Sequence, residues 1–196
     1  MKHVPNALTI LRILVTPLLL YLLYRATLAG HFWALTLFVF AAISDWLDGK
    51  LARRYAVKSR LGQYLDPMAD KILVLGTFIV LAIRFPELVP WWAVLIVASR
   101  DVAVTVLRSV FERKGLSLHT SSSAKWKTAA QLTYLIAFLL TLTLTHVPGA
   151  IGRSAIGLMD SSFYFWSLLA VAAITVYTGI QYFVNRKTED PVAHHA

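Results

Sequence analysis

Six long apolar segments follow one another along this chain, and each is close to the length that crosses a lipid bilayer. A transmembrane helix needs about 20 mostly apolar residues, since its backbone groups find no water to bond with inside the membrane. The sequence therefore predicts six membrane-spanning helices, with ends placed to within a few residues. The predicted spans are 8–24, 32–53, 67–83, 91–111, 127–146 and 161–184.

The composition is typical of a membrane protein rather than a soluble one. Apolar residues make up 58% of the 196 positions, above the roughly 45–50% of soluble domains. The sequence contains no internal repeat and no segment that reads as a separate soluble domain. We therefore expect one all-α, polytopic membrane domain over residues 1–196, a six-helix bundle with a short disordered tail over about 187–196.

Local signals predict where several of these helices begin. Asn6 is placed to cap the first helix, because a short polar side chain accepts hydrogen bonds from the first free N–H groups. Asp160 with Ser161 is placed to cap the sixth helix, and Pro90 stands where the fourth should begin. Indole rings are expected at the headgroup boundary. The tryptophans near predicted span ends are Trp91, Trp92, Trp126 and Trp166.

Basic residues are divided unevenly between the two sides of the predicted bundle. The side with few of them has Arg25, Arg84 and Arg153. Because lysine and arginine are enriched in cytoplasmic loops, both termini and the 50–65 loop are predicted to be cytoplasmic. The basic residues on that side are Lys2, Lys50, Arg53, Arg54, Lys58, Arg60, Arg113, Lys114, Lys125, Lys127, Arg186 and Lys187.

The net charge of +9 is interpreted through the same membrane setting. Basic loops that lie against anionic headgroups explain it better than nucleic-acid binding does. The N-terminal stretch also resembles a secretory signal, but Arg12 interrupts its apolar part, and cleavage would leave an odd number of spans. We see no transit peptide and expect the cytoplasmic (inner) membrane of a bacterium.

Four aspartates lie within one segment of this apolar chain: Asp45, Asp48, Asp66 and Asp70. Charge in or near the membrane costs at least about 2.5 kcal/mol per group. The first two lie three apart at the end of the second span, and the last two lie four apart at the start of the third, so each pair shares a helix face. A short loop makes the spans antiparallel neighbours, and the four carboxylates converge. One or two divalent cations would offset their repulsion, and without cysteine the ligands must be oxygen or imidazole.

Each part of this segment also has a simpler explanation. Asp66 precedes Pro67, which is a common arrangement of a helix cap and the first helical residue. Asp45 could pair with Lys50 or Arg53 on its own helix. The small residues in between could serve only as ordinary helix contacts. Each explanation is credible singly, but all of them holding at once at fixed spacings is much less so.

The spacings decide between these explanations. The pattern reads Asp45-x-x-Asp48-Gly49-x-x-Ala52-Arg53, then eight residues, then Gly62-x-x-x-Asp66-x-x-x-Asp70. It resembles the signature of the CDP-alcohol phosphatidyltransferase family at every position. Members of that family have six membrane helices and a site that faces the cytoplasm, so the resemblance covers most of the chain.

The resemblance implies metal-dependent transfer of a phosphatidyl group from CDP-diacylglycerol to an alcohol, with release of CMP. It implies that the four aspartates hold two Mg²⁺ or Mn²⁺ ions and that Asp70 is the general base for the acceptor hydroxyl. Gly62 would let the loop turn into the third span. The implied contacts of the CDP-lipid are Asn6, Thr9, Gly49, Ala52, Arg53 and Gly62.

Basic residues in and after the fourth span indicate the acceptor. Arg100 and Arg108 are costly inside a span unless they face the bundle interior or a wet cavity, although Arg108 could also snorkel to the interface. With Lys125 and Lys127 they are interpreted as a basic pocket for an acceptor phosphate. Together with residues 5–9 and Arg12 they are similar to the branch of the family whose acceptor is sn-glycerol 3-phosphate, which is the acceptor we expect.

One residue departs from that branch. Asp101 follows Arg100 where the branch usually has glutamate, and Arg-Asp-Val also occurs in the branch that uses phosphatidylglycerol as acceptor. An Arg100–Asp101 structural pair is plausible too, though adjacent residues point in different directions. Phosphatidylglycerol therefore stays open as the alternative acceptor, with inositol phosphate and serine behind it.

A divalent-cation transporter is the alternative from another functional class. It predicts acidic residues near the bilayer midplane and on several spans. Here the aspartates cluster at the ends of two spans, beside arginines that would repel a permeating cation. The enzyme interpretation is therefore preferred, with membrane lipids as surroundings and, by resemblance, a homodimer as the assembly.

Overall fold

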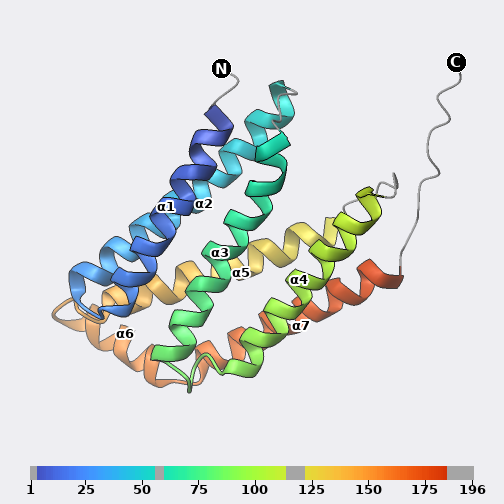
Figure 1. Cartoon of the computed structure of the whole chain (residues 1–196). Coiled ribbons are helices and arrows are strands. Elements are labelled where there is room, and N and C mark those ends of the chain that lie inside the picture. The colour runs from blue at the N-terminus through green and yellow to red at the C-terminus, as the bar shows by residue number, and fades with distance from the viewer. Residues whose placement is uncertain (1–3, 56–59, 114–121, 185–196) are drawn as a thin grey trace, which may run out of the picture.

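The computed structural model describes residues 4–55, 60–113 and 122–184, and Figure 1 shows how their helices are arranged. The described part forms seven α-helices. Their bounds are α1 Val4–Tyr24, α2 Leu28–Tyr55, α3 Arg60–Arg84, α4 Trp91–Arg113, α5 Ser122–Leu144, α6 Ala150–Asp160 and α7 Phe163–Val184. The predicted tail over about 187–196 lies outside the described residues. The all-α prediction is confirmed for the part described.

All six predicted spans coincide with helices, namely α1 to α5 and α7. Within the described residues, three segments are long and apolar enough to cross a membrane: Leu28–Leu47, Trp126–Leu144 and Phe163–Gln181. Leu11–Tyr24 is apolar but shorter. These segments are those of an all-helical membrane protein.

The short helix α6 has no counterpart among the predicted spans. It begins after Gly149, whose φ of 94° favours glycine because it has no Cβ. Its 11 residues rise only about 16 Å, well short of a hydrocarbon core about 30 Å thick. The apolar-length criterion therefore could not detect it.

Two predicted helix caps are wrong. Asn6 does not cap the first helix, because α1 already begins at Val4. Asp160 is the last residue of α6 rather than a cap of α7. Ser161 does contribute at that junction, since the Phe163 N–H donates to Ser161 Oγ at 3.3 Å. The two errors have a common cause. A short polar residue caps the start of a helix only when the residues before it are not helical, and here helical residues precede both Asn6 and Asp160.

The long helices alternate in direction, which sorts their ends onto two sides of the molecule. In Figure 1 the start of α1, the end of α2 and the start of α3 lie at the top, and the end of α4, the start of α5 and the end of α7 lie to the right. α1 contacts both α2 and α3, and α5 contacts α2, α3, α6 and α7. At the opposite side, His31 Nδ1 lies 3.0 Å from His146 Nε2 and joins the start of α2 to the segment after α5.

Aromatic side chains fill the centre, while many large apolar side chains point outward. Phe138 packs edge-on against Tyr164 with ring centroids 4.7 Å apart, and Phe78 stacks on Tyr134 at 5.8 Å. Outward-facing apolar groups are what a bilayer accommodates and water does not. The four tryptophans predicted near span ends do lie near helix starts with exposed rings: Trp91, Trp92, Trp126 and Trp166.

Candidate active site

The end of one helix that carries the aspartate motif and the start of the other lie on the same side of the molecule. Asp45 and Asp48 lie toward the end of α2, and Asp66 and Asp70 lie in the first half of α3. Only residues 56–59 separate the helices, so their ends lie at most about 18 Å apart by chain length. Figure 1 shows these two ends beside the start of α1. The backbone thus brings the two halves of the motif to the same place.

Two predictions about this junction are wrong because both helices run further than expected. Gly62 does not form a loop turn, since α3 begins at Arg60. Asp66 and Pro67 lie inside α3 and do not begin it, so the capping explanation of Asp66 no longer holds. Proline is unfavourable inside a helix because it lacks the N–H group. α3 also contacts α1, and such tertiary packing supplies most of the stability of a helix in a protein.

Asp45 is held by a residue of α1. Arg12 Nη1 lies 2.6 Å from Asp45 Oδ1, and only 1% of the Arg12 side chain is exposed against 46% for Asp45. A buried arginine needs a counter-charge, and this pair supplies it. Among the described residues Asp45 therefore pairs with Arg12, while the side chains of Lys50 and Arg53, the partners suggested by its own helix, lie outside the described part.

Sequence reasoning does not identify Arg12 as a partner of the motif. The available signal is its position inside an apolar stretch, where a charged side chain is costly without a partner. The partner itself lies 33 positions away on another helix, and no spacing rule relates the two. The Arg12 carbonyl also accepts a hydrogen bond from Thr16 Oγ1 at 2.7 Å.

A second charged cluster joins α4, α5 and α7. Lys127 Nζ lies 2.7 Å from Asp101 Oδ2, and both side chains are buried. Arg100 approaches the other carboxylate oxygen and Thr178 Oγ1, each at 3.4 Å. The structure thus brings together two of the four residues predicted to bind an acceptor phosphate, around Asp101. The Arg100–Asp101 pair that the sequence made plausible is present at 3.4 Å. We name Arg100, Asp101 and Lys127 the basic cluster.

The basic cluster combines two cations with one carboxylate and contains a buried donor of Arg100 without a partner among the described residues. Two cations surround a single carboxylate, so the three side chains carry a net charge of +1. Arg100 Nε is buried and has no hydrogen-bond partner among the described residues. The aliphatic part of Arg100 lies against Gly179 of α7, where an added Cβ would stand 3.0 Å from Arg100 Cγ. A buried donor beside an excess cation is suited to an anionic ligand.

Comparison with known proteins identifies the family. Residues 2–178 match the family described as CDP-alcohol phosphatidyltransferase. The chain belongs to the CDP-alcohol phosphatidyltransferase family. This confirms the resemblance seen in the aspartate motif and extends it over nearly the whole chain, so the acidic and basic clusters both lie within one family domain.

Three bacterial relatives illustrate the range of this family. A CDP-diacylglycerol–glycerol-3-phosphate 3-phosphatidyltransferase of Cereibacter sphaeroides is 36% identical over 74% of this chain and 67% of its own length. A protein of the same name from Pseudomonas fluorescens is 30% identical over 91% of this chain and 84% of its own length. A cardiolipin synthase (CMP-forming) of Streptomyces coelicolor is 37% identical over 57% of this chain and 53% of its own length.

The residue types of the aspartate motif at the α2–α3 junction suit the hard divalent cations that the sequence predicts. The donors on offer are carboxylates, which suit Mg²⁺ and Mn²⁺. Although Asp45 is ion-paired, its side chain is about half exposed and stays accessible to a ligand. No three His, Asp or Glu side chains gather within the part of the chain that the structure describes. The other three motif aspartates have side chains outside that part, so the four-ligand cluster stays a prediction.

Several predicted site residues lie in helices whose side chains are not described there. Two of these residues lie in α1, four in α2, three in α3, one in α4 and one in α5. The predicted roles of these side chains stay predictions. They are Asn6, Thr9, Asp48, Gly49, Ala52, Arg53, Gly62, Asp66, Asp70, Arg108 and Lys125.

Proposed function

We propose that this protein transfers the phosphatidyl group of CDP-diacylglycerol to sn-glycerol 3-phosphate, giving phosphatidylglycerophosphate and CMP. The observation that carries the proposal is the complete aspartate motif on two helices whose ends meet, with Asp45 fixed by Arg12 and still about half exposed. Relatives named for this reaction align with most of the chain and support the same choice.

The aspartates would do the central work of the reaction. Two divalent cations held by Asp45, Asp48, Asp66 and Asp70 would neutralise the pyrophosphate and stabilise the attacking and leaving oxygens. Asp70 would accept the proton of the acceptor hydroxyl while that oxygen bonds to the phosphatidyl phosphorus. The bond from this phosphorus to the CMP oxygen breaks, and CMP leaves with the electron pair. Arg12 would keep the Asp45 carboxylate in place throughout.

The basic cluster supports glycerol 3-phosphate as the acceptor. Its net charge of +1 and the unpartnered Nε of Arg100 would receive the acceptor phosphate. Asp101 would hold Lys127 in position, and Arg108 and Lys125 would complete the pocket. The phosphate monoester of glycerol 3-phosphate carries more negative charge than the phosphodiester of phosphatidylglycerol, and the basic residues of the fourth and fifth helices would match it.

Phosphatidylglycerol is the second candidate acceptor. Asp101 is found in the branch that uses this lipid, and the relative from Streptomyces coelicolor is named as a cardiolipin synthase. That relative aligns with only about half of either chain. The glycerol 3-phosphate assignment is therefore preferred.

The proposed function includes a membrane arrangement. Six helices, α1 to α5 and α7, would cross the cytoplasmic membrane of a bacterium, with both termini and the aspartate end on the cytoplasmic side. The alternating helix directions and the basic residues on that side support this arrangement. CDP-diacylglycerol could then keep its acyl chains in the bilayer while its nucleotide enters from the cytoplasm. The protein would act as a homodimer.

The test is CMP release by purified protein with CDP-diacylglycerol and Mg²⁺ or Mn²⁺, offering each acceptor separately. Release with glycerol 3-phosphate that stops on chelation supports the proposal. Release with phosphatidylglycerol instead keeps the mechanism and changes the acceptor. No release with glycerol 3-phosphate, phosphatidylglycerol, inositol phosphate or serine contradicts the enzyme assignment and favours the cation transporter.

A further inference from the structure

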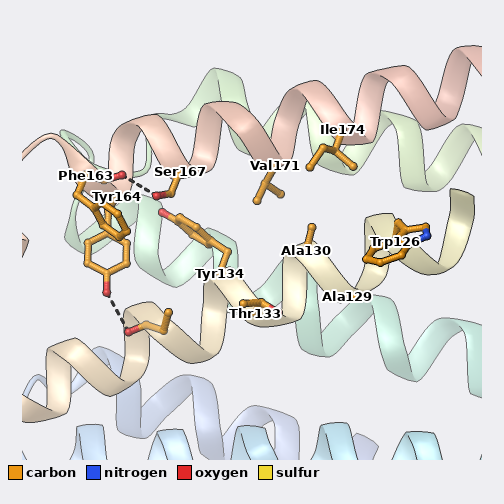
Figure 2. Close-up of a pocket in the computed structure, with 11 residues that line it drawn as sticks. Trp126, Ala129, Ala130, Thr133, Tyr134, Phe163, Tyr164, Ser167, Val171 and Ile174 are labelled. Carbon is orange, nitrogen blue, oxygen red and sulfur yellow. Dashed lines mark hydrogen bonds between the residues drawn. The ribbon is translucent and has the colours of Figure 1, made fainter.

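An apolar groove of about 470 Å³ runs between α5 and α7. Figure 2 shows Trp126 at one end and Phe163 with Tyr164 at the other. Small residues of α5 form one wall, and Val171 and Ile174 of α7 face them. The α5 residues are Trp126, Ala129, Ala130, Thr133, Tyr134 and Ala137.

The dimensions of the groove favour an extended chain over a helix. Trp126 and Ala137 are eleven positions apart, which is about 16 Å along an α-helix. That is roughly half of a hydrocarbon core about 30 Å thick, the depth of one leaflet. Dividing the volume by this length gives a cross-section of roughly 30 Å², far below that of a helix about 10 Å wide.

The surroundings of the groove are lipid rather than water. Both walls belong to segments long and apolar enough to cross a membrane, Trp126–Leu144 and Phe163–Gln181. The groove is open to the outside, since Trp126 and Phe163 at its two ends are well exposed. An apolar groove in such a wall gains most when an apolar chain fills it.

One end of the groove adjoins the basic cluster. Lys127 follows Trp126 on α5, and Thr178, which contacts Arg100, lies one turn beyond Ile174 on α7. The cluster has an excess positive charge and a buried Arg100 Nε without a partner among the described residues. An anionic headgroup at this end would complement that charge.

We propose that the α5–α7 groove binds one acyl chain of an anionic glycerophospholipid from the leaflet on the aspartate side, with the lipid phosphate beside the basic cluster. This site shares the basic cluster with the proposed acceptor phosphate, so the two phosphates would compete there. Its occupant is a bilayer lipid, held with or without metal and CDP-lipid. The site would anchor α7 to α5 where few side chains fill the space between them.

The test uses the full-length protein in vesicles with a chelator present and no CDP-lipid. The probe is phosphatidylglycerol with a photoreactive diazirine in the middle of one acyl chain. We expect labelled peptides from the groove residues of α5 and α7. Labelling spread evenly over all lipid-facing helices would overturn the proposal, and so would the absence of labelled peptides from the groove residues.

Two alanines provide a matched pair of variants. Ala129 lines the groove and is exposed, while Ala173 of α7 is exposed outside it. Ala129→Phe should lower groove labelling about tenfold, because its ring displaces at least two methylenes of the chain. Ala173→Phe should leave labelling unchanged. Equal labelling in both variants would contradict the site, and Ile174→Trp gives a second way to fill the groove if Ala129→Phe does not fold.

The headgroup and the reaction are tested separately. A phosphatidylcholine probe with the same diazirine should label the groove less than phosphatidylglycerol does, and equal labelling would overturn the anionic preference. Asp45→Asn should abolish CMP release yet keep groove labelling. If the wild-type protein released CMP normally but showed no groove labelling, the lipid site alone would be refuted. If it showed groove labelling but released no CMP with any acceptor, the proposed function alone would be refuted.

Discussion

The two charged regions of this molecule bury opposite partners. At the α2–α3 junction the arginine is buried and the aspartate is about half exposed. In the basic cluster the aspartate is buried, with 5% of its side chain exposed, and the cations surround it. In each region the buried charged group holds its partners in position. The charge that remains available to a ligand is the exposed carboxylate in the first region and the additional cation in the second. The first region therefore presents a carboxylate and the second a cation.

The largest expected effect is on the exposed carboxylate. Asp45→Asn should lower CMP release at least about 100-fold, because it removes a negative ligand from a site whose metals supply several kcal/mol of stabilisation. Membrane insertion should be kept, while the unfolding temperature should fall somewhat, because the buried Arg12 loses this counter-charge although the Asn amide oxygen can still accept a hydrogen bond. Asp160→Asn, at the end of α6, is the matched control and should keep wild-type turnover. Full turnover by Asp45→Asn would end the metal-site assignment.

The buried carboxylate should matter more for stability than Asp45 does. Asp101→Asn should destabilise the fold by about 3 kcal/mol, because two buried cations, Lys127 and Arg100, lose the carboxylate that both contact. The measurement is the midpoint of thermal unfolding in detergent, compared with Asp45→Asn. If the two substitutions lowered the unfolding midpoint equally, the structural role of Asp101 could not be separated from the ligand-binding role of Asp45.

The excess cation should affect the acceptor and not the lipid donor. Arg100→Gln should raise KM for glycerol 3-phosphate about tenfold, as expected for the loss of one charge-assisted hydrogen bond. KM for CDP-diacylglycerol should stay within about twofold, a difference too small to reflect a lost hydrogen bond. Arg153→Gln in α6, on the other side of the molecule, is the control. An equal rise for both substrates would place Arg100 outside the acceptor site.

The smallest effect concerns the packing beneath Arg100. Gly157→Ala, where an added Cβ meets nothing within 4 Å, should stabilise α6 by about 0.5 kcal/mol through helix propensity. Gly179→Ala should lose this gain, because its Cβ would crowd Arg100 Cγ at 3.0 Å. Thermal unfolding measures both, and equal gains would show that Arg100 does not depend on close contact with α7.

The sequence predicts a helix well where the segment is apolar and long enough to cross a bilayer. A segment that crosses the hydrocarbon core must satisfy its backbone internally, so apolar length alone indicates α1 to α5 and α7. The prediction fails where that constraint ends. The 11-residue α6 is too short to cross the membrane, and the ends of α2 and α3 continue as helix beyond the apolar stretches.

The aspartate motif and the family are also readable from the sequence, because the spacing of a motif is a property of one or two adjoining helices. The motif alone indicates the CDP-alcohol phosphatidyltransferase family, and the family match over residues 2–178 confirms it. The partners of the charges are not readable in this way. Asp45 with Arg12 and Asp101 with Lys127 are 33 and 26 positions apart.

Those pairings depend on which helices pack together and how each is rotated about its axis. Neither quantity follows from a local pattern, because a helix with apolar residues on every side has no preferred face in lipid. The sequence by itself thus determined the helices, the motif and the class of chemistry. Only the tertiary structure decided which charge of each pair is buried, since burial is set by neighbouring helices rather than by the residue itself.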